Sequence, residues 1–449
     1  MTIQAWERYA PTEAMPWNER RVIHLYRRAA FGATWAQVQR DLRDGPDAAI
    51  DRLIAGRTHV ASQKTDFESL SQRLGRDAVT SRRVDRLKSW WIFRMIFTPD
   101  PLTERLVLMW HNHFATGIQK VRNLSMMKRQ NDWMRQFAKS HFRELLGGVV
   151  KSPAMLVWLD AQVNHKDHPN ENLAREVMEL FTLGEGNYTE SDVKEAARAL
   201  TGWTIDEGKL DYDEQIHDDG EKTILGESGR FNGDDLLKIL AENKATAKRI
   251  ANRICELLMG ENVIATPQVD ALAEGLRTHN LDIRWGIETV LRSERFFRDD
   301  NIGNRPLGPI EFIVGAVRGL ELFESTPSTL LLSEWSAAMG QDLFLPPSVF
   351  GWPGGRAWLT TRTLISRANF AAAAAAGRLH AVPRPLRLDH LIGRYDWSEP
   401  EMRSNLSRLL AGVDSGVADG NVYGRNDQVG DSGVAWVETL LASPDAQLG

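Results

Sequence analysis

The chain has 449 residues, of which 42% are hydrophobic and 26% are charged, a balance typical of a globular protein. Lys and Arg number 55 and Asp and Glu number 60, which gives a net charge of −5. A general nucleic-acid-binding protein carries a basic surface, so this charge argues against that class. Cys255 is the only cysteine, which excludes an intrachain disulfide and a metal site built from several thiolates.

The sequence contains no run of 18 apolar residues, so no membrane span is expected. Residues 1–8 lack the basic and apolar segments of a secretory signal, and a cytoplasmic protein is therefore the default expectation. Export stays open as an alternative, because an exported chain without its signal would look the same.

Apolar residues recur with helical spacing along most of the chain, which predicts an all-α protein built as a globular bundle of many helices. Thr34 and Gln37 have the spacing of a capping box, and Thr189 is expected to cap a further helix. Gly377 is expected just past the end of an alanine-rich helix. In chain order the predicted helical segments are 21–30, one beginning after Thr34, 69–97, 102–114, 123–138, 170–183, 190–200, several within 234–297, 310–323, 328–339 and 361–376.

One long segment departs from this pattern. Residues 203–229 are polar and rich in glycine, with short alternating runs, and they predict a β-hairpin or a long ordered loop. A proline-rich stretch at 305–309 marks a boundary, so we expect a main helical domain at 1–304 and a C-terminal helical part at 305–449 that packs on it as one compact unit. Residues 346–355 form a rigid loop in this prediction, and residues 412–433 form a loop near the end.

Several long motifs are specific enough to identify a relative. Through them the chain resembles the bacterial family catalogued as domain of unknown function 1800. The motifs lie at residues 28–32, 110–116, 170–184, 186–190, 196–203, 217–218, 222–223, 225–226, 351–355, Trp358, Arg367 and Asn369. The resemblance spans nearly the whole chain. It implies no activity. It does imply that related proteins are often exported and that they often accompany a second, uncharacterised family, similar to the sulfatase and phosphatase group, so a protein partner of that kind is one possibility.

The first candidate residues lie at the end of the predicted helix 102–114. At about 100° per residue, His113 falls inside the apolar arc with Trp110, while His111 points roughly the opposite way. Two histidines at this spacing can bind one metal ion only if the helix unwinds near Asn112. The alternatives are a core histidine bonded to the main chain at position 113 and a structural residue at position 111.

The second group lies on the predicted helix from residue 171. Glu176 falls at the edge of the apolar arc, with Asn172 and Glu179 on the same side, so its carboxylate needs a partner. An arginine, a histidine or a metal ion would each serve. Glu171 and Arg175 have the spacing of a surface ion pair.

Two further candidates come from the irregular segments. His217 and Asp218 are adjacent, and an Asp beside a His can orient the ring or share a cation, although a simple turn explains the pair equally well. Trp352 and Trp358 would form an aromatic wall for a ligand or, alternatively, fix a packed loop.

These residues lead to three hypotheses. The best is a metal-dependent hydrolase, in which His111, His113, Glu176 and His217 bind zinc, iron or manganese and Glu179 or Asp218 acts as the base. Asn112, Asn172, Arg175, Trp352 and Trp358 would then complete the binding site. The second is a non-catalytic helical binding or assembly protein, in which a buried His/Glu/Arg network fixes the helices. The third is a redox or cofactor-binding enzyme that uses a histidine as an axial ligand.

Overall fold

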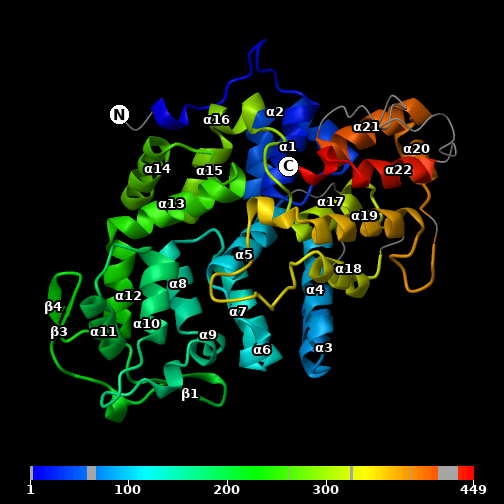
Figure 1. Ribbon diagram of the computed structural model, residues 1–449. Coiled ribbons are helices and arrows are strands. Elements are labelled where there is room, and N and C mark those ends of the chain that lie inside the picture. The colour runs from blue at the N-terminus through cyan, green and yellow to red at the C-terminus, as the bar shows by residue number, and fades with distance from the viewer. Residues whose placement is uncertain (1–3, 58–66, 262, 324–326, 385, 413–432) are drawn as a thin grey trace.

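The computed structural model describes residues 4–57, 67–261, 263–323, 327–384, 386–412 and 433–449. These residues are mostly helical, with two small two-stranded sheets, which confirms the predicted all-α class (Figure 1). Within them, no helix has the length and apolar character needed to cross a membrane. The loop predicted at 412–433 lies almost entirely outside the described residues.

Among the described residues, those up to 158 form nine α-helices, one of which is almost completely buried. They are α1 (Glu19–Ala29), α2 (Trp35–Ile54), α3 (Phe67–Thr80), α4 (Val84–Phe97), α5 (Pro101–His113), α6 (Ile118–Val121), α7 (Leu124–Phe137), α8 (Phe142–Val150) and α9 (Pro153–Trp158). Every residue of α5 except Asn112 is buried, and α1, α2, α4 and α7 pack around it. The predicted cap of α2 is confirmed, because Thr34 and Gln37 form both bonds of the capping box. The stretch 69–97, predicted as mostly helical, is broken into α3 and α4 near Arg82, whose φ of 55° is left-handed.

Charged side chains are built into the packing around α5. Glu104 is buried and accepts hydrogen bonds from Arg94 of α4 at 2.7 Å and from Arg135 of α7 at 2.6 Å. The indole Nε1 of Trp91 also donates to this carboxylate, at 3.1 Å. A buried carboxylate without such partners would cost several kcal/mol, so these bonds fix the positions of three helices relative to one another.

The middle of the chain carries most of the sequence motifs. Its helices are α10 (Asn172–Glu176), which continues as a π-helix (Val177–Thr182), α11 (Glu190–Ala199), α12 (Gly233–Glu242), α13 (Lys244–Leu258), α14 (Thr266–Thr278), α15 (Ile283–Leu291) and α16 (Glu294–Phe297). The predicted excursion at 203–229 is confirmed and consists of two antiparallel hairpins rather than one. They pair β1 (Trp203–Asp206) with β2 (Lys209–Tyr212), and β3 (Lys222–Ile224) with β4 (Glu227–Gly229).

The C-terminal part adds a layer of helices on α1 and α4, at the right of Figure 1. They are α17 (Pro309–Gly319), α18 (Thr329–Ala338), α19 (Thr361–Ala375), α20 (Asp389–Tyr395), α21 (Glu399–Ala411) and α22 (Gly433–Ala442). α17 and α18 both contact α4, and α21 contacts α1. The C-terminal helices thus pack on the N-terminal ones, while the division at 304/305 stays a prediction.

Candidate functional site

The helix that carries the sequence motif at residues 170–184, here called the motif helix, begins with α10 and is not a regular α-helix throughout. It starts at Asn172, and the side chain of Asn170 accepts a hydrogen bond from the Asn172 N–H at 3.0 Å. From Val177 the helix widens into a π-helix, in which the N–H of Leu183 bonds to Met178 five residues earlier, at 2.7 Å. Such π segments are rare and often mark functional regions, so the surroundings of this helix are the first place to look for a site.

The end of the π-helix is capped by two side chains from other helices. Arg249 of α13 donates from Nε to the carbonyl of Leu180 at 2.6 Å, and His113 of α5 donates from Nε2 to the carbonyl of Phe181 at 3.0 Å. The last carbonyls of a helix have no partner within it and carry partial negative charge, which explains why donors of this kind lie here.

His113 is held in its neutral form. Burial, and then the positive charges of Arg253 and Arg249, keep the pKa of His113 well below its usual range. The neutral ring carries one N–H, and the carbonyl of Phe181 can only accept a hydrogen bond, so that N–H is assigned to Nε2. The structure therefore shows His113 in the role of a buried hydrogen-bond donor that joins α5 to the π-helix.

His111, two residues earlier, lies in a different environment. Its ring is fully buried and is surrounded by the rings of Trp91, Phe344 and Trp352, at centroid distances of 5.3, 5.4 and 5.5 Å. Burial lowers the pKa of His111 to about 3. Neither ring nitrogen has a hydrogen-bond partner in the described part of the chain. None of the rings around His111 touches that of His113, so the two histidines do not face one site.

Asn112 joins α5 to the loop at residues 346–355, which contains Trp352. Its Oδ1 accepts from the main-chain N–H of Trp352 at 2.6 Å, and its Nδ2 donates to the Trp352 carbonyl at 3.4 Å. The indoles of Trp352 and Trp358 are buried, with exposed fractions of 3% and 8%. The predicted aromatic wall therefore does not face solvent, and the loop has the packed arrangement that the sequence left as the alternative.

The two glutamates of the motif helix lie close to each other. Burial and the neighbouring charge of Glu179 raise the pKa of Glu176. The Glu179 carboxylate accepts a hydrogen bond from the hydroxyl of Tyr188 at 2.5 Å. On the same helix Asn172 donates to Asp160 at 3.3 Å, and Arg175 forms the expected pair with Glu171 at 3.0 Å together with a second pair to Glu190 at 2.7 Å.

The predicted pair His217 and Asp218 fastens the hairpins to α11. His217 donates from Nδ1 to the carbonyl of Thr201 at 2.8 Å. Arg198 binds both oxygens of Asp218, at 2.7 and 3.1 Å, and lowers the pKa of that carboxyl. An ionised carboxylate held by an arginine is a poor general base, so this arrangement anchors the segment more readily than it performs proton transfer.

The predicted metal ligands are not brought together. Among the residues that the structure describes, no three His, Cys, Asp or Glu side chains are close enough to bind one metal ion. His111 and His113 face separate sets of rings, and His217 bonds to the main chain of Thr201. The metal and base assignments made from the sequence stay predictions, and the geometry gives them no support.

The structure instead opens a groove beside the π-helix, which we call the α13 groove. It has a volume of about 630 Å³ and is lined by residues of α13 and α14 together with Leu183 and Asn187. The two helices pack side by side (Figure 1). Its basic lining residues are Lys244, Lys248, Arg249, Arg253 and Arg277. Its acidic lining residues are Glu256, Asp270 and Glu274. Five basic against three acidic side chains leave an excess of two positive charges.

The ion pairs within the α13 groove show where that excess lies. Lys248 pairs with Asp270 at 2.7 Å, Arg253 with Glu256 at 2.9 Å, and Arg277 with Glu274 at 2.7 Å. These pairs use all three carboxylates of the lining. Lys244 and Arg249 are left without an ion pair among the described residues.

The arginines of α13 also lie close enough to repel each other. Burial, and then the charge of Arg253, lower the pKa of Arg249. The Nε of Arg253 is buried and has no hydrogen-bond partner in the described chain. An anion bound between the two guanidinium groups would relieve this repulsion.

Sequence reasoning did not find this groove. Lys244, Lys248 and Asn252 are spaced four residues apart, as are Arg249 and Arg253, so the basic face of α13 is visible in the sequence. What the spacing could not show is that Arg249 of this face bonds to the end of the π-helix, and that Arg249 and Arg253 lie close enough to His113 to lower its pKa.

Comparisons with known proteins agree with the motif analysis. Residues 24–448 match the model of one family, described as a protein of unknown function (DUF1800). Neither the curated proteins nor the solved structures gave a match.

Proposed function

The chain belongs to the DUF1800 family, and we propose that it is a helical binding protein that holds an anionic ligand in the α13 groove. The observation that carries this proposal is the charge balance of the groove, in which Arg249 and Lys244 remain after every lining carboxylate has been paired. The half-buried guanidinium of Arg249 feels the charges of Glu256 and Glu179 but forms an ion pair with neither, and an anionic ligand would supply a directly bound counter-charge.

The chemistry of the lining defines the class of ligand. Guanidinium and ammonium groups bind phosphate, sulfate and carboxylate, and an arginine does so through two parallel hydrogen bonds. The side-chain amide of Asn252 adds a neutral donor beside them. A volume of about 630 Å³ lies in the range of small-molecule sites, so we expect a small anionic molecule.

The placement of the motif residues favours binding over the hydrolase predicted from the sequence. His113, Asn112 and Asp218 each use their polar atoms to join one segment of the fold to another. We therefore propose that these residues keep the framework rigid, and that the α13 groove is the surface that this framework presents.

The proposal is tested by isothermal titration of the protein with inorganic phosphate, inorganic sulfate and acetate as probes. The test variant carries Lys244→Glu together with Lys248→Gln, since both side chains are exposed and neither lies in the core. The control is Lys238→Glu on α12, which is equally exposed and does not line the groove.

We expect the wild type and the control to bind at least one probe with equal affinity. The double variant should bind it at least about tenfold more weakly, a loss of about 1.4 kcal/mol. Raising the ionic strength should weaken binding, because exposed charges are screened. Equal affinity of the wild type and the double variant, or no binding of any probe, would overturn the proposal.

A further inference from the structure

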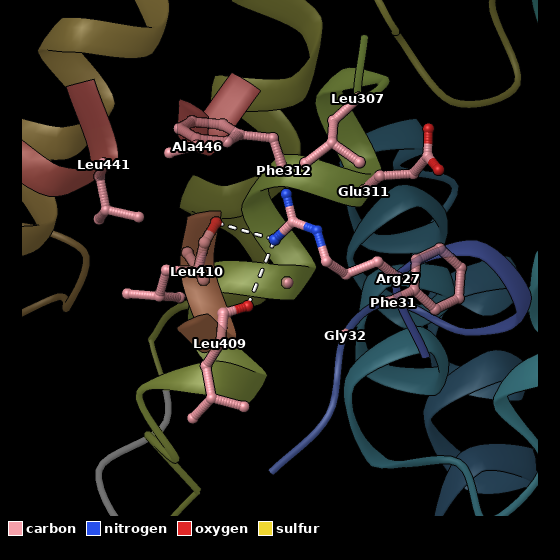
Figure 2. A pocket seen from close by; sticks show the side chains of 12 residues that line it. Arg27, Phe31, Gly32, Leu307, Glu311, Phe312, Leu409, Leu410, Leu441 and Ala446 are labelled. Carbon is pink, nitrogen blue, oxygen red and sulfur yellow. Dashed lines mark hydrogen bonds between the residues drawn. The ribbon is translucent and has the colours of Figure 1, made fainter. Parts of the chain in front are cut away.

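The α13 groove differs in size and access from the small cavity beside Arg27 in the core. That cavity measures about 20 Å³, and Figure 2 shows the Arg27 guanidinium bonded to the carbonyls of Leu409 and Leu410. It can hold one water molecule at most, and its guanidinium already has acceptors. The α13 groove has about 630 Å³ and is lined by charged side chains that are partly exposed, so it can admit a small organic molecule.

Several hydrogen-bond donors of the groove are free to bind such a molecule. Arg249 uses its Nε for the carbonyl of Leu180, and its two Nη groups make no hydrogen bond with the described residues. Within the same part of the chain, the ammonium of Lys244 and the side-chain amide of Asn252 also make none. Free guanidinium and ammonium donors bind an anionic group through charge-assisted hydrogen bonds.

The same groove offers acceptors, which an inorganic anion would not use. Asp270, Glu256 and Glu274 each bind a cation through one carboxylate oxygen, and their side chains are between 41% and 54% exposed. The second oxygen of each accepts no hydrogen bond from the residues that the structure describes. Ionised carboxylates can only accept hydrogen bonds, and hydroxyl groups can donate them. A ligand that fits this lining therefore carries hydroxyl groups beside its anionic group.

Charge and composition narrow the class of ligand further. The groove has an excess of two positive charges. A phosphate monoester, with a charge of about −1.5 to −2 at neutral pH, matches this excess better than a carboxylate or a sulfate ester, which carries one. None of the described residues that line the groove is aromatic, whereas sites for free nucleobases commonly stack the base on an aromatic ring.

We propose that the ligand of the α13 groove is a sugar phosphate. Its phosphate binds the free donors of Arg249 and Lys244. Its hydroxyl groups donate to the free carboxylate oxygens of Asp270, Glu256 and Glu274. This inference rests on the proposed function, since it names the class of anion that the groove holds, and it gives the acidic residues of the lining a part in recognition.

The test is isothermal titration of the full chain at neutral pH with inorganic phosphate, glucose 6-phosphate, ribose 5-phosphate and glutamate as probes. We expect at least one of the two sugar phosphates to bind at least about tenfold more tightly than inorganic phosphate, because hydrogen bonds from hydroxyl groups to charged acceptors are added. Glutamate, which has no hydroxyl group and a single net charge, should bind more weakly than that sugar phosphate.

The variant Glu274→Gln separates recognition of the hydroxyl groups from the effect of charge. It leaves the groove more positive, so inorganic phosphate should bind as tightly as to the wild type or more tightly. The advantage of the sugar phosphate over inorganic phosphate should fall by at least about threefold, because an amide oxygen is a weaker acceptor than a carboxylate oxygen. Glu399→Gln is the matched control, since Glu399 is equally exposed, at 54%, and also pairs with an arginine of its own helix. It should change neither affinity.

The outcomes distinguish this inference from the proposed function. Binding of inorganic phosphate that is as tight as that of both sugar phosphates would overturn the inference and leave anion binding in the groove intact. Tighter binding of glutamate than of either sugar phosphate, or an equal gain of affinity for phosphate and sugar phosphate in Glu274→Gln, would also contradict it. No binding of any probe would overturn both the inference and the proposed function.

Discussion

Asn112 makes both main-chain hydrogen bonds of Trp352, although the two residues are 240 positions apart in the chain. The amide thus binds the late loop as a neighbouring β-strand would, with one acceptor and one donor. His111 lies against the Trp352 ring from the same side of α5. The sequence motifs at residues 110–116 and 351–355 therefore contact each other in the fold.

This contact predicts a specific requirement for glycine at position 351. Gly351 has a φ of 80°, and a Cβ there would overlap the side chain of Asn112. Gly186 has a φ of 81° with open space around it, so it is a matched control. Gly186→Ala should cost about 1 to 2 kcal/mol from backbone strain alone. Gly351→Ala should cost about 1 to 3 kcal/mol more, because the clash is added.

Urea unfolding of both glycine variants measures this difference directly. Equal losses of stability would show that Asn112 can move away from the added Cβ at no cost, and that the Asn112 contact does not constrain the loop.

The two motif histidines should respond in opposite ways to the same substitution. His111→Phe removes two ring nitrogens that have no partner and keeps the aromatic contacts, so stability should be unchanged or higher. His113→Phe leaves the buried carbonyl of Phe181 without its donor and should cost about 1 to 3 kcal/mol. The midpoints of urea unfolding compare them. A larger loss for His111→Phe than for His113→Phe would contradict these roles.

The buried carboxyl of Glu104 leads to a prediction about how the stability of the protein changes at acid pH. Burial alone would raise the pKa of Glu104, but Arg135 and Arg94 lower it to about 2, below the ordinary value of 4.5. A carboxyl with a lowered pKa stabilises the fold above its unfolded pKa and loses that contribution as the pH falls. Between about pH 4.5 and pH 2 the loss should reach about 3 kcal/mol.

The substitution Glu104→Gln isolates this contribution. It should destabilise the protein by about 3 kcal/mol at neutral pH, because Arg94 and Arg135 lose the buried carboxylate that they share and keep only the more exposed Glu68 and Asp132 as partners. The variant should also show a shallower fall in stability across the acid range. An unchanged acid profile in the variant would mean that other carboxyls dominate it.

The contribution of Glu176 to the stability of the protein should depend on pH in the opposite direction. Its pKa is raised by burial and by Glu179, so the ionised form is disfavoured in the fold. Stability is then lost as the pH rises from the ordinary pKa of 4.5 through the raised value. Glu176→Gln should therefore stabilise the protein at neutral pH by less than about 1 kcal/mol, since the side chain is partly exposed, and should have no stabilising effect in acid. Destabilisation at neutral pH would show that the carboxylate has a partner, as the metal hypothesis requires.

The sequence predicted the fold class well because helical periodicity and caps are local signals. Thr34 with Gln37 forms the predicted capping box, and Thr189 caps the start of α11 as predicted. The opposite directions of His111 and His113 also followed from helix geometry. These features depend only on residues a few positions apart.

The environment of each candidate residue could not be predicted in the same way. Whether His113 meets a metal ion or the carbonyl of Phe181 depends on a helix some 70 residues later in the chain, and on its switch to π geometry. The α13 groove was missed because the sequence does not show which carboxylates of the groove pair with which cations, and so does not show that Arg249 has no ion pair. A motif shows which residues matter for the fold more readily than which residues face a ligand.

The most direct test of the central claim is to locate an anion in the α13 groove. Crystals of the wild type grown with selenate, which has the shape and charge of sulfate, allow the ion to be found by anomalous diffraction at the selenium edge. The account predicts a peak within hydrogen-bond distance of Arg249 or Lys244. Selenate bound only at other surfaces, with the groove occupied by water alone, would contradict it.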